Sequence, residues 1–246
     1  MPEIQLPQAN LLKAACANCS VLEFCLPIGL TGSEVERLDT LILRRVKVKK
    51  GAALYRTGDS LHALYAIRVG SFKTSILSDD GREQVTGFQI PGEMLGLDAI
   101  SVSRHACNAF ALEDSEVCPI HFAQLEKLAQ SLPSLQHNLN KLLSREIVRD
   151  HSMLMLMGSM NTEERLATFL LNLSQRLSIR GYSPKEFLLK MRREEIGSYL
   201  GLRLETVCRG IASLRGVGVV EIVGRNVKIL DIDRLKHLAA GCHRDA

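Results

Sequence analysis

Residues 193–214, REEIGSYLGLRLETVCRGIASL, carry the pattern that decides the fold. Ile196 and Leu200 are apolar at positions i and i+4 of a first helix. Gly201 follows, where a glycine permits a tight turn between two helices. A second helix has an apolar face made of Val207, Ile211 and Leu214. This spacing predicts a helix-turn-helix.

Two charged residues lie on another face of the second helix. Glu205 and Arg209 are four positions apart, near its start. In a DNA-reading helix this region meets base edges, where Arg can donate two hydrogen bonds to guanine and Glu can accept one from cytosine. Two ordinary packed helices with a surface Glu–Arg pair would show the same pattern.

The distribution of charge favours DNA binding. The 246 residues carry a formal net charge of +4. Residues 162–246 hold 15 Lys and Arg against 10 Asp and Glu, whereas residues 1–161 hold 16 against 17. A positive excess confined to one domain is typical of nucleic-acid binding. Residues 219–230 predict a hairpin around Gly224, so we expect a winged helix-turn-helix that binds double-stranded DNA.

Upstream of this domain, residues 44–121 alternate short apolar runs with turn signals. Runs such as 63–69 and 71–77 suit strands of five to seven residues. A series of such strands predicts an all-β barrel or a double-sheet, jelly-roll-like β-roll.

Helix start signals flank the roll. Residues 33–43 predict a helix with Ser33 as N-cap and Glu36 completing a capping box. Residues 162–178 predict a second helix with Thr162 as N-cap. The expected fold class is therefore α+β. The expected domains are a cysteine-rich arm at 1–30, the roll at 31–132, a long dimerisation helix at 133–160 and the winged helix-turn-helix at 161–246.

The long helix, expected at 134–158, has one stripe whose members are separated by 4, 3, 4 and 3 residues. The members are Leu143, Ile147, Asp150, Leu154 and Met157. This spacing fits a seam between two helices and hence a homodimer. The stripe could equally pack on its own domain.

Three of the seven cysteines lie close together in the sequence. Cys16, Cys19 and Cys25 follow the pattern C-x2-C-x5-C, and a short loop can bring such thiolates around one metal centre. An iron–sulfur cluster needs about four ligands. The fourth could come from Cys107, Cys118, Cys208 or Cys242. Spacing alone leaves an iron–sulfur cluster, a zinc ion and a thiol–disulfide switch open.

Other classes of protein are disfavoured. No apolar run approaches the roughly 18 residues of a membrane helix, and the first ten residues lack the features of a signal peptide. We therefore expect a cytoplasmic protein without a membrane partner. An iron–sulfur enzyme would need acid–base groups near the metal, but the seven histidines are scattered without motif spacing. The sequence thus predicts no enzyme.

The segment 194–209, EEIGSYLGLRLETVCR, resembles the helix-turn-helix of the cyclic-AMP receptor protein/FNR superfamily of bacterial transcription regulators. Residues 65–100, 161–176 and 180–197 are similar to its oxygen-responsive FNR branch. Leu204 supports that branch, because the cyclic-AMP branch has an Arg before the recognition Glu. The resemblance implies half-sites similar to TTGAT. Cys208 departs from the Ser usual in FNR, and Cys is a weaker hydrogen-bonding partner.

The same resemblance assigns the metal site and its role. SEVCPIHF is similar to the segment that holds the distal ligand, so Cys16, Cys19, Cys25 and Cys118 are expected to bind an oxygen-labile [4Fe–4S] cluster. The cluster would promote dimerisation and DNA binding, and oxygen would reverse both. Without it, repulsion between two Asp150 carboxylates would hold the chain monomeric. A regulator of the same fold that senses through zinc or free thiols is the alternative.

Two further expectations follow from the resemblance. The turn at residues 78–82 is similar to a surface that touches RNA polymerase. The cyclic-nucleotide branch binds its ligand with a Glu and an Arg from the roll, but Leu97 stands at the Glu-like place and Arg104 is out of register. No cyclic nucleotide is therefore expected.

Overall fold

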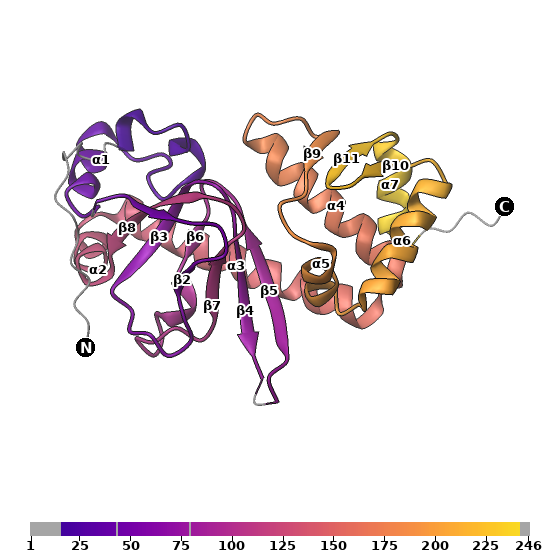
Figure 1. Ribbon diagram of the computed structural model, residues 1–246. Coiled ribbons are helices and arrows are strands. Elements are labelled where there is room, and N and C mark those ends of the chain that lie inside the picture. Colours follow the sequence, from indigo (N-terminus) through magenta and orange to yellow (C-terminus); the bar gives the residue numbers. More distant parts are fainter. Residues whose placement is uncertain (1–15, 43, 79, 242–246) are drawn as a thin grey trace.

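The computed structural model describes residues 16–42, 44–78 and 80–241. A roll of strands with its arm and a helical domain lie side by side, and one long helix connects them (Figure 1). In the part of the chain that the structure describes, no helix is both long and apolar enough to cross a membrane.

Two four-stranded antiparallel sheets form the roll. One has the order β1 (Val46–Val48), β8 (Ser115–His121), β3 (Ala63–Val69) and β6 (Met94–Leu95). The other has the order β2 (Ala53–Tyr55), β7 (Asn108–Ala111), β4 (Phe72–Leu77) and β5 (Glu83–Gln89). Ile67, Phe72 and Val117 are fully buried between the sheets. The short strands predicted between residues 44 and 121 are thereby confirmed.

Short helices surround the roll at its N-terminal end and at its turns. They are η1 (Cys16–Asn18), η2 (Leu22–Phe24), α1 (Gly32–Asp39), η3 (Leu97–Ala99) and α2 (Phe122–Ser131). The prediction of Ser33 as N-cap of the first α-helix is wrong. Thr31 caps α1 instead, and its backbone N–H donates to the Glu34 carboxylate at 2.8 Å. Thr31 and Glu34 have the same three-residue separation as Ser33 and Glu36, so the spacing alone does not fix the register.

The long helix α3 runs from Pro133 to Ser159. Pro133 stands in its first turn, where the missing N–H costs no hydrogen bond. The first half of α3 packs on the roll through Leu135, and the second half reaches the helical domain through Leu156. This continuous helix is the connection between the two domains (Figure 1).

The helical domain contains the predicted helix-turn-helix. Its elements are α4 (Thr162–Ile179), β9 (Glu186–Leu188), α5 (Arg193–Leu200), α6 (Leu204–Gly216), β10 (Val220–Val223), β11 (Asn226–Ile229) and α7 (Ile232–Ala239). The predicted hairpin is β10–β11, and β9 adds a third strand that the sequence analysis did not anticipate. The prediction of Thr162 as N-cap is wrong, because Asn161 accepts from the Glu164 backbone N–H at 3.0 Å.

The turn between α5 and α6 depends on glycine. Gly201 has a φ of 64°, in the left-handed region that glycine tolerates without strain. Gly197 on α5 also lacks room for a side chain, since a Cβ there would lie 2.7 Å from the Leu202 carbonyl oxygen. The two glycines therefore allow the tight turn and the close packing between α5 and α6.

Candidate functional site

Helix α6 presents its charged face outward. Val207, Ile211 and Leu214 are buried against the domain core, whereas Glu205 and Arg209 are exposed. Glu205 stands in the first turn and Arg209 one turn further along. Both side chains are therefore free to reach a ligand outside the domain, as a DNA-reading helix requires.

Cys208 lies at the edge of this face and is half-buried. The Nη1 group of Arg193 on α5 donates to its Sγ at 3.5 Å. Leu204, one turn earlier, is 37% exposed. A cavity of about 470 Å³ separates α6 from the wing, and Cys208, Arg193 and Arg225 are among its lining residues. The basic side chains around this cavity suit phosphate contacts.

The four predicted cysteine ligands come together. Cys16, Cys19, Cys25 and Cys118 line one small pocket, which is otherwise walled mainly by apolar side chains of the arm, α1 and strands β3 and β8. The backbone N–H of Cys16 donates to the Asp39 carboxylate at 2.8 Å and fastens η1 to the end of α1. Sequence places Cys118 more than 90 residues after the other three, and the roll closes that gap.

The environment of these thiols is apolar. Burial raises the pKa of Cys25 to about 12, with a smaller contribution in the same direction from neighbouring Cys118. Burial also raises the pKa of Cys16 and of Cys118. Cys16, Cys25 and Cys118 therefore hold their protons at neutral pH in the metal-free chain, and binding of any metal would displace those protons.

The donor set suits an iron–sulfur cluster. Four thiols converge on one pocket with apolar walls, and iron–sulfur clusters are held by cysteine thiolates. Among the described residues, no three or more His, Cys, Asp or Glu side chains already adopt metal-binding geometry. The residues needed are thus neighbours, but closing them around a metal centre requires their side chains to move.

The remaining cysteines lie elsewhere. Cys107 is buried in the core of the roll, where burial raises its pKa to about 12 and Asp98 acts in the same direction. Cys242 lies outside the described residues.

The stripe on α3 is not packed on its own chain. Ile147 and Leu154 are 55% and 69% exposed, and Leu143, Asp150 and Met157 are exposed as well. Val148 and Met155, which the stripe did not include, are also exposed. Large apolar side chains left open in a row favour the two-helix seam over packing within the domain.

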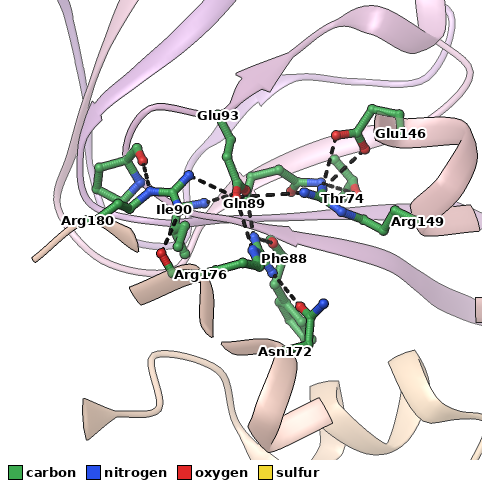
Figure 2. A network of polar contacts seen from close by, with 11 residues as sticks. Thr74, Phe88, Gln89, Ile90, Glu93, Glu146, Arg149, Asn172, Arg176 and Arg180 are labelled. Carbon is green, nitrogen blue, oxygen red and sulfur yellow. Dashed lines mark hydrogen bonds and ion pairs between the residues drawn. The ribbon is translucent and has the colours of Figure 1, made fainter. Parts of the chain in front are cut away.

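Sequence reasoning missed a polar network between the roll and the helical domain (Figure 2). Its centre is Glu93, whose carboxylate is contacted by Arg176 of α4 at 2.6 Å and by Arg180 at 3.1 Å. Arg149 of α3 lies 3.7 Å away. The only sequence signal is an acidic residue after a Pro-Gly turn, and its partners stand 56 to 87 residues later.

The turn at residues 78–82 is held by local polar contacts. The Ser78 hydroxyl donates to the Asp80 carboxylate at 2.5 Å, and the Arg82 guanidinium pairs with the same carboxylate at 2.6 Å. Asp79 lies outside the described residues. The hairpin projects from the roll, and Ile76 and Leu77 near its tip are exposed (Figure 1).

Comparisons with known proteins agree with this arrangement. Residues 45–131 match the cyclic nucleotide-binding domain and residues 164–238 the Crp-like helix-turn-helix domain. The chain is 48% identical to the transcriptional regulatory protein btr of Bordetella pertussis, over 92% of this chain and 93% of that protein. It is 42% identical to the transcriptional activator protein anr of Pseudomonas aeruginosa, over 96% and 95%.

A third relative is the fumarate and nitrate reduction regulatory protein of Escherichia coli, 41% identical over 91% of this chain and 90% of that protein. Among solved structures, FixK2 of Bradyrhizobium japonicum aligns with a TM-score of 0.74 and 29% identity, over 80% of this chain and 96% of that one. These relatives bear the names of regulators and not of enzymes, as the sequence predicts.

Proposed function

The chain belongs to the Crp/FNR family of transcription regulators, and on that premise we propose that it is an oxygen-responsive member that binds palindromic DNA as a homodimer. The helix-turn-helix is the DNA-binding part. In the proposal, the cysteine pocket holds a [4Fe–4S] cluster and the exposed face of α3 pairs two copies.

DNA reading rests on the open face of α6. Arg209 donates two hydrogen bonds to a guanine, and Glu205 accepts from a cytosine amino group. Cys208 stands beside them and contacts the backbone or an outer base. Two such helices related by a two-fold axis read two half-sites similar to TTGAT, about one helical turn apart.

The observation that carries the sensing role is the convergence of Cys16, Cys19, Cys25 and Cys118 on one pocket. When bound there, a [4Fe–4S] cluster supplies iron–sulfur bonds that oxygen breaks. The residues of the chain do the rest: Cys118 belongs to strand β8 of the rigid roll, while the other three lie on the short arm. Ligation therefore ties the arm to the roll.

Dimerisation follows from the open stripe on α3. Two copies bury Leu143, Ile147, Leu154 and Met157 against each other, and this opposes repulsion between paired Asp150 carboxylates. Each half-site alone offers few contacts, so a monomer binds the palindrome weakly.

We propose that no cyclic nucleotide regulates this protein. The Asp98 carboxylate accepts from the backbone N–H groups of Ala106 and Cys107 at 2.8 and 3.3 Å. The N–H groups that an anionic ligand would seek are thus already satisfied. Arg104 is exposed and donates to the Gly58 carbonyl at 2.9 Å instead.

The projecting turn at residues 78–82 is proposed to contact RNA polymerase. The exposed Ile76 and Leu77 beside this polar turn provide apolar surface next to charged groups, as in many protein–protein contacts.

The test is to purify the protein without oxygen and to measure iron and sulfide per chain with the visible spectrum. About four of each per chain, with bleaching in air, would support the cluster. Cys118→Ser should lose both, whereas Cys107→Ser, outside the pocket, should keep them. A protein that contains zinc or no metal would rule out the cluster and favour sensing through zinc or thiols. Specific DNA binding would in that case still support a role as a transcription regulator.

A further inference from the structure

The turn that follows β5 holds one carboxylate among three guanidiniums. Glu93 is only 12% exposed at its side chain. Arg176 contacts it through Nη2 at 2.6 Å and Nε at 3.0 Å, and Arg180 through Nη2 at 3.1 Å. Arg149 approaches to 3.7 Å. Figure 2 shows these side chains arriving from α3 and α4 on opposite sides of the carboxylate.

The arginines also hold the backbone of the turn. Arg176 donates to the Phe88 carbonyl at 2.6 Å, and Arg180 donates to the Pro91 carbonyl. The backbone N–H of Ile90 donates to the Glu93 carboxylate at 3.1 Å. The turn, the end of α4 and the middle of α3 are therefore joined at one point.

This junction depends on the charge of Glu93. Burial alone would raise the pKa of Glu93, but Arg176 and Arg149 outweigh burial, and the pKa is lowered. Without the negative charge, the largely buried guanidiniums of Arg176 and Arg180 would face each other, while Arg149 would keep its ion pair with Glu146 at 3.2 Å. Removing one partner of such a buried set leaves charge uncompensated, which is strongly unfavourable.

The cysteine arm packs against the same turn. A Cβ on Gly92 would lie 2.8 Å from the Cβ of Phe24, so the arm and the turn pack closely there. The Arg180 guanidinium lies 5.7 Å from the centre of the Phe24 ring, within the range of a cation–π contact. Phe24 directly precedes Cys25, which is buried in the cysteine pocket.

There is room for this junction to rearrange. A cavity of about 560 Å³ lies beside it, and its lining includes Phe24, Glu93, Arg149, Arg176 and Arg180. The side chains of arm, roll, α3 and α4 therefore meet at an open cavity rather than in a closed core.

We propose that Glu93 is the positioning residue that sets the angle of the DNA-binding domain against α3, and that the cysteine arm acts on this angle through Phe24. Since α3 carries the dimer face, this angle sets the separation of the two α6 helices. The inference rests on the proposed dimeric reading of palindromes.

Other contacts between roll and helical domain offer a matched control. Lys190, beyond β9, pairs with Glu113 at 2.7 Å. This pair joins the same two domains but touches neither α3 nor the arm. Glu113→Gln therefore removes an interdomain carboxylate without disturbing the junction.

The first experiment measures DNA affinity against half-site spacing, in anaerobically purified protein. Palindromes have half-sites one helical turn apart, or spaced about two base pairs wider or narrower. Wild type and Glu113→Gln should prefer one spacing. In Glu93→Gln, the affinity for the palindrome with that spacing should fall at least about tenfold, while the affinity for a single half-site should stay within about twofold of wild type. The reason is that binding of the second half-site raises the overall affinity by roughly 10²–10⁴-fold only when both recognition helices can bind at once. Equal loss at every spacing, or none, would overturn the proposal.

The second experiment needs no DNA and uses the full chain as purified. Hydrogen exchange of residues 88–93 and 176–180 should accelerate in Glu93→Gln and in Phe24→Ala, but not in Glu113→Gln. Phe24→Tyr keeps the ring and should restore the wild-type rate. If wild type has no spacing preference, the proposed function fails, but the hydrogen-exchange rates still test whether Glu93 and Phe24 hold the junction together. Unchanged exchange in Glu93→Gln or Phe24→Ala would overturn the inference.

Discussion

Arg209 is exposed on α6, one turn after Glu205, in the part of a DNA-reading helix that meets base edges. Because a bidentate Arg–guanine contact discriminates one base pair, Arg209→Ala should cost about 1–3 kcal/mol of binding free energy and relax preference at one G·C pair. Competition binding against single-substituted sites measures both. Arg215→Ala, at the exposed far end of α6, should leave the base preference unchanged. An equal loss on all sequences would show that Arg209 touches only phosphate.

Glu93 makes stability depend on pH in a defined direction. Its pKa lies below the usual 4.5 in the folded chain, so it contributes stability that is present above that value and lost as pH falls through the folded pKa. The difference in unfolding free energy between wild type and Glu93→Gln should be largest at neutral pH and shrink in acid. Urea unfolding across this range measures it. A difference that stays constant across this pH range would contradict the assignment.

At the residue scale, sequence reveals functional side chains when their partners are near in the chain or carried by a pattern. Glu205 and Arg209 are four positions apart, and three of the cysteines lie within ten residues. The ion pairs of Glu93 are made with arginines from α3 and the end of α4, far away in the sequence, and no local spacing predicts such contacts. Buried ion networks are formed by packing, so sequence periodicity cannot reveal them.

Two glycines of α6 test how closely this helix packs against α4. A Cβ on Gly210 would lie 2.4 Å from Leu166 Cδ1 and 2.9 Å from Thr162 Cγ2 of α4, whereas one on Gly216 would meet nothing within 4 Å. Overpacking costs about 1–3 kcal/mol, and the gain in helix propensity offsets up to about 1 kcal/mol. Gly210→Ala should therefore lower the unfolding free energy, while Gly216→Ala should leave it level or raise it. Thermal unfolding decides, and equal effects would contradict the close packing.

The stripe of α3 combines exposed apolar side chains with one carboxylate. Two Asp150 side chains in a seam would repel each other, so Asp150→Ala should strengthen the metal-free dimer by about tenfold in dissociation constant, or ~1.4 kcal/mol. Sedimentation across a concentration series measures this. Glu126→Ala, far from the stripe, is the control. A variant that is no more dimeric than wild type would remove Asp150 from the switch.

At the element scale, the sequence predicts helices and strands well but their ends less well. The 4-3-4-3 stripe and the apolar runs between turns give the lengths of α3 and β3 closely. The two predicted N-caps fail because Ser, Thr, Asp and Asn can all cap, and two of them lie close together at the start of each helix, Thr31 and Ser33 at α1 and Asn161 and Thr162 at α4. Packing of the first turn decides among them, as Asn161 shows by its reciprocal contacts with Glu164.

For the whole molecule, order along the chain carries most of the architecture. The charge distribution, the series of strands, the long helix and the helix-turn-helix each predict one part of the fold. The matched family domains occur in the same order along the chain. The sequence does not predict β9 and α7 because each is short, and β9 is stable only as the third strand beside β11. The contacts between the two halves cannot be predicted from the sequence either, because side chains such as Glu93, Lys190 and Arg165 make them across the boundary. Arg165 alone donates to carbonyls of Met157, Met160 and Leu200.

The assembly as a whole predicts how metal removal should act. If the arm governs dimerisation, chelating iron from anaerobically purified protein should lower affinity for the full palindrome by roughly 10²-fold or more and leave single half-site affinity nearly unchanged, because avidity is lost while α6 is intact. Fluorescence anisotropy on both DNAs, with sedimentation of the same samples, measures the two effects together. Cys118→Ser, treated identically, should begin at the low affinity and not change. A parallel loss on half-site and palindrome would mean that the metal acts on the reading helix itself and not on the pairing of two chains.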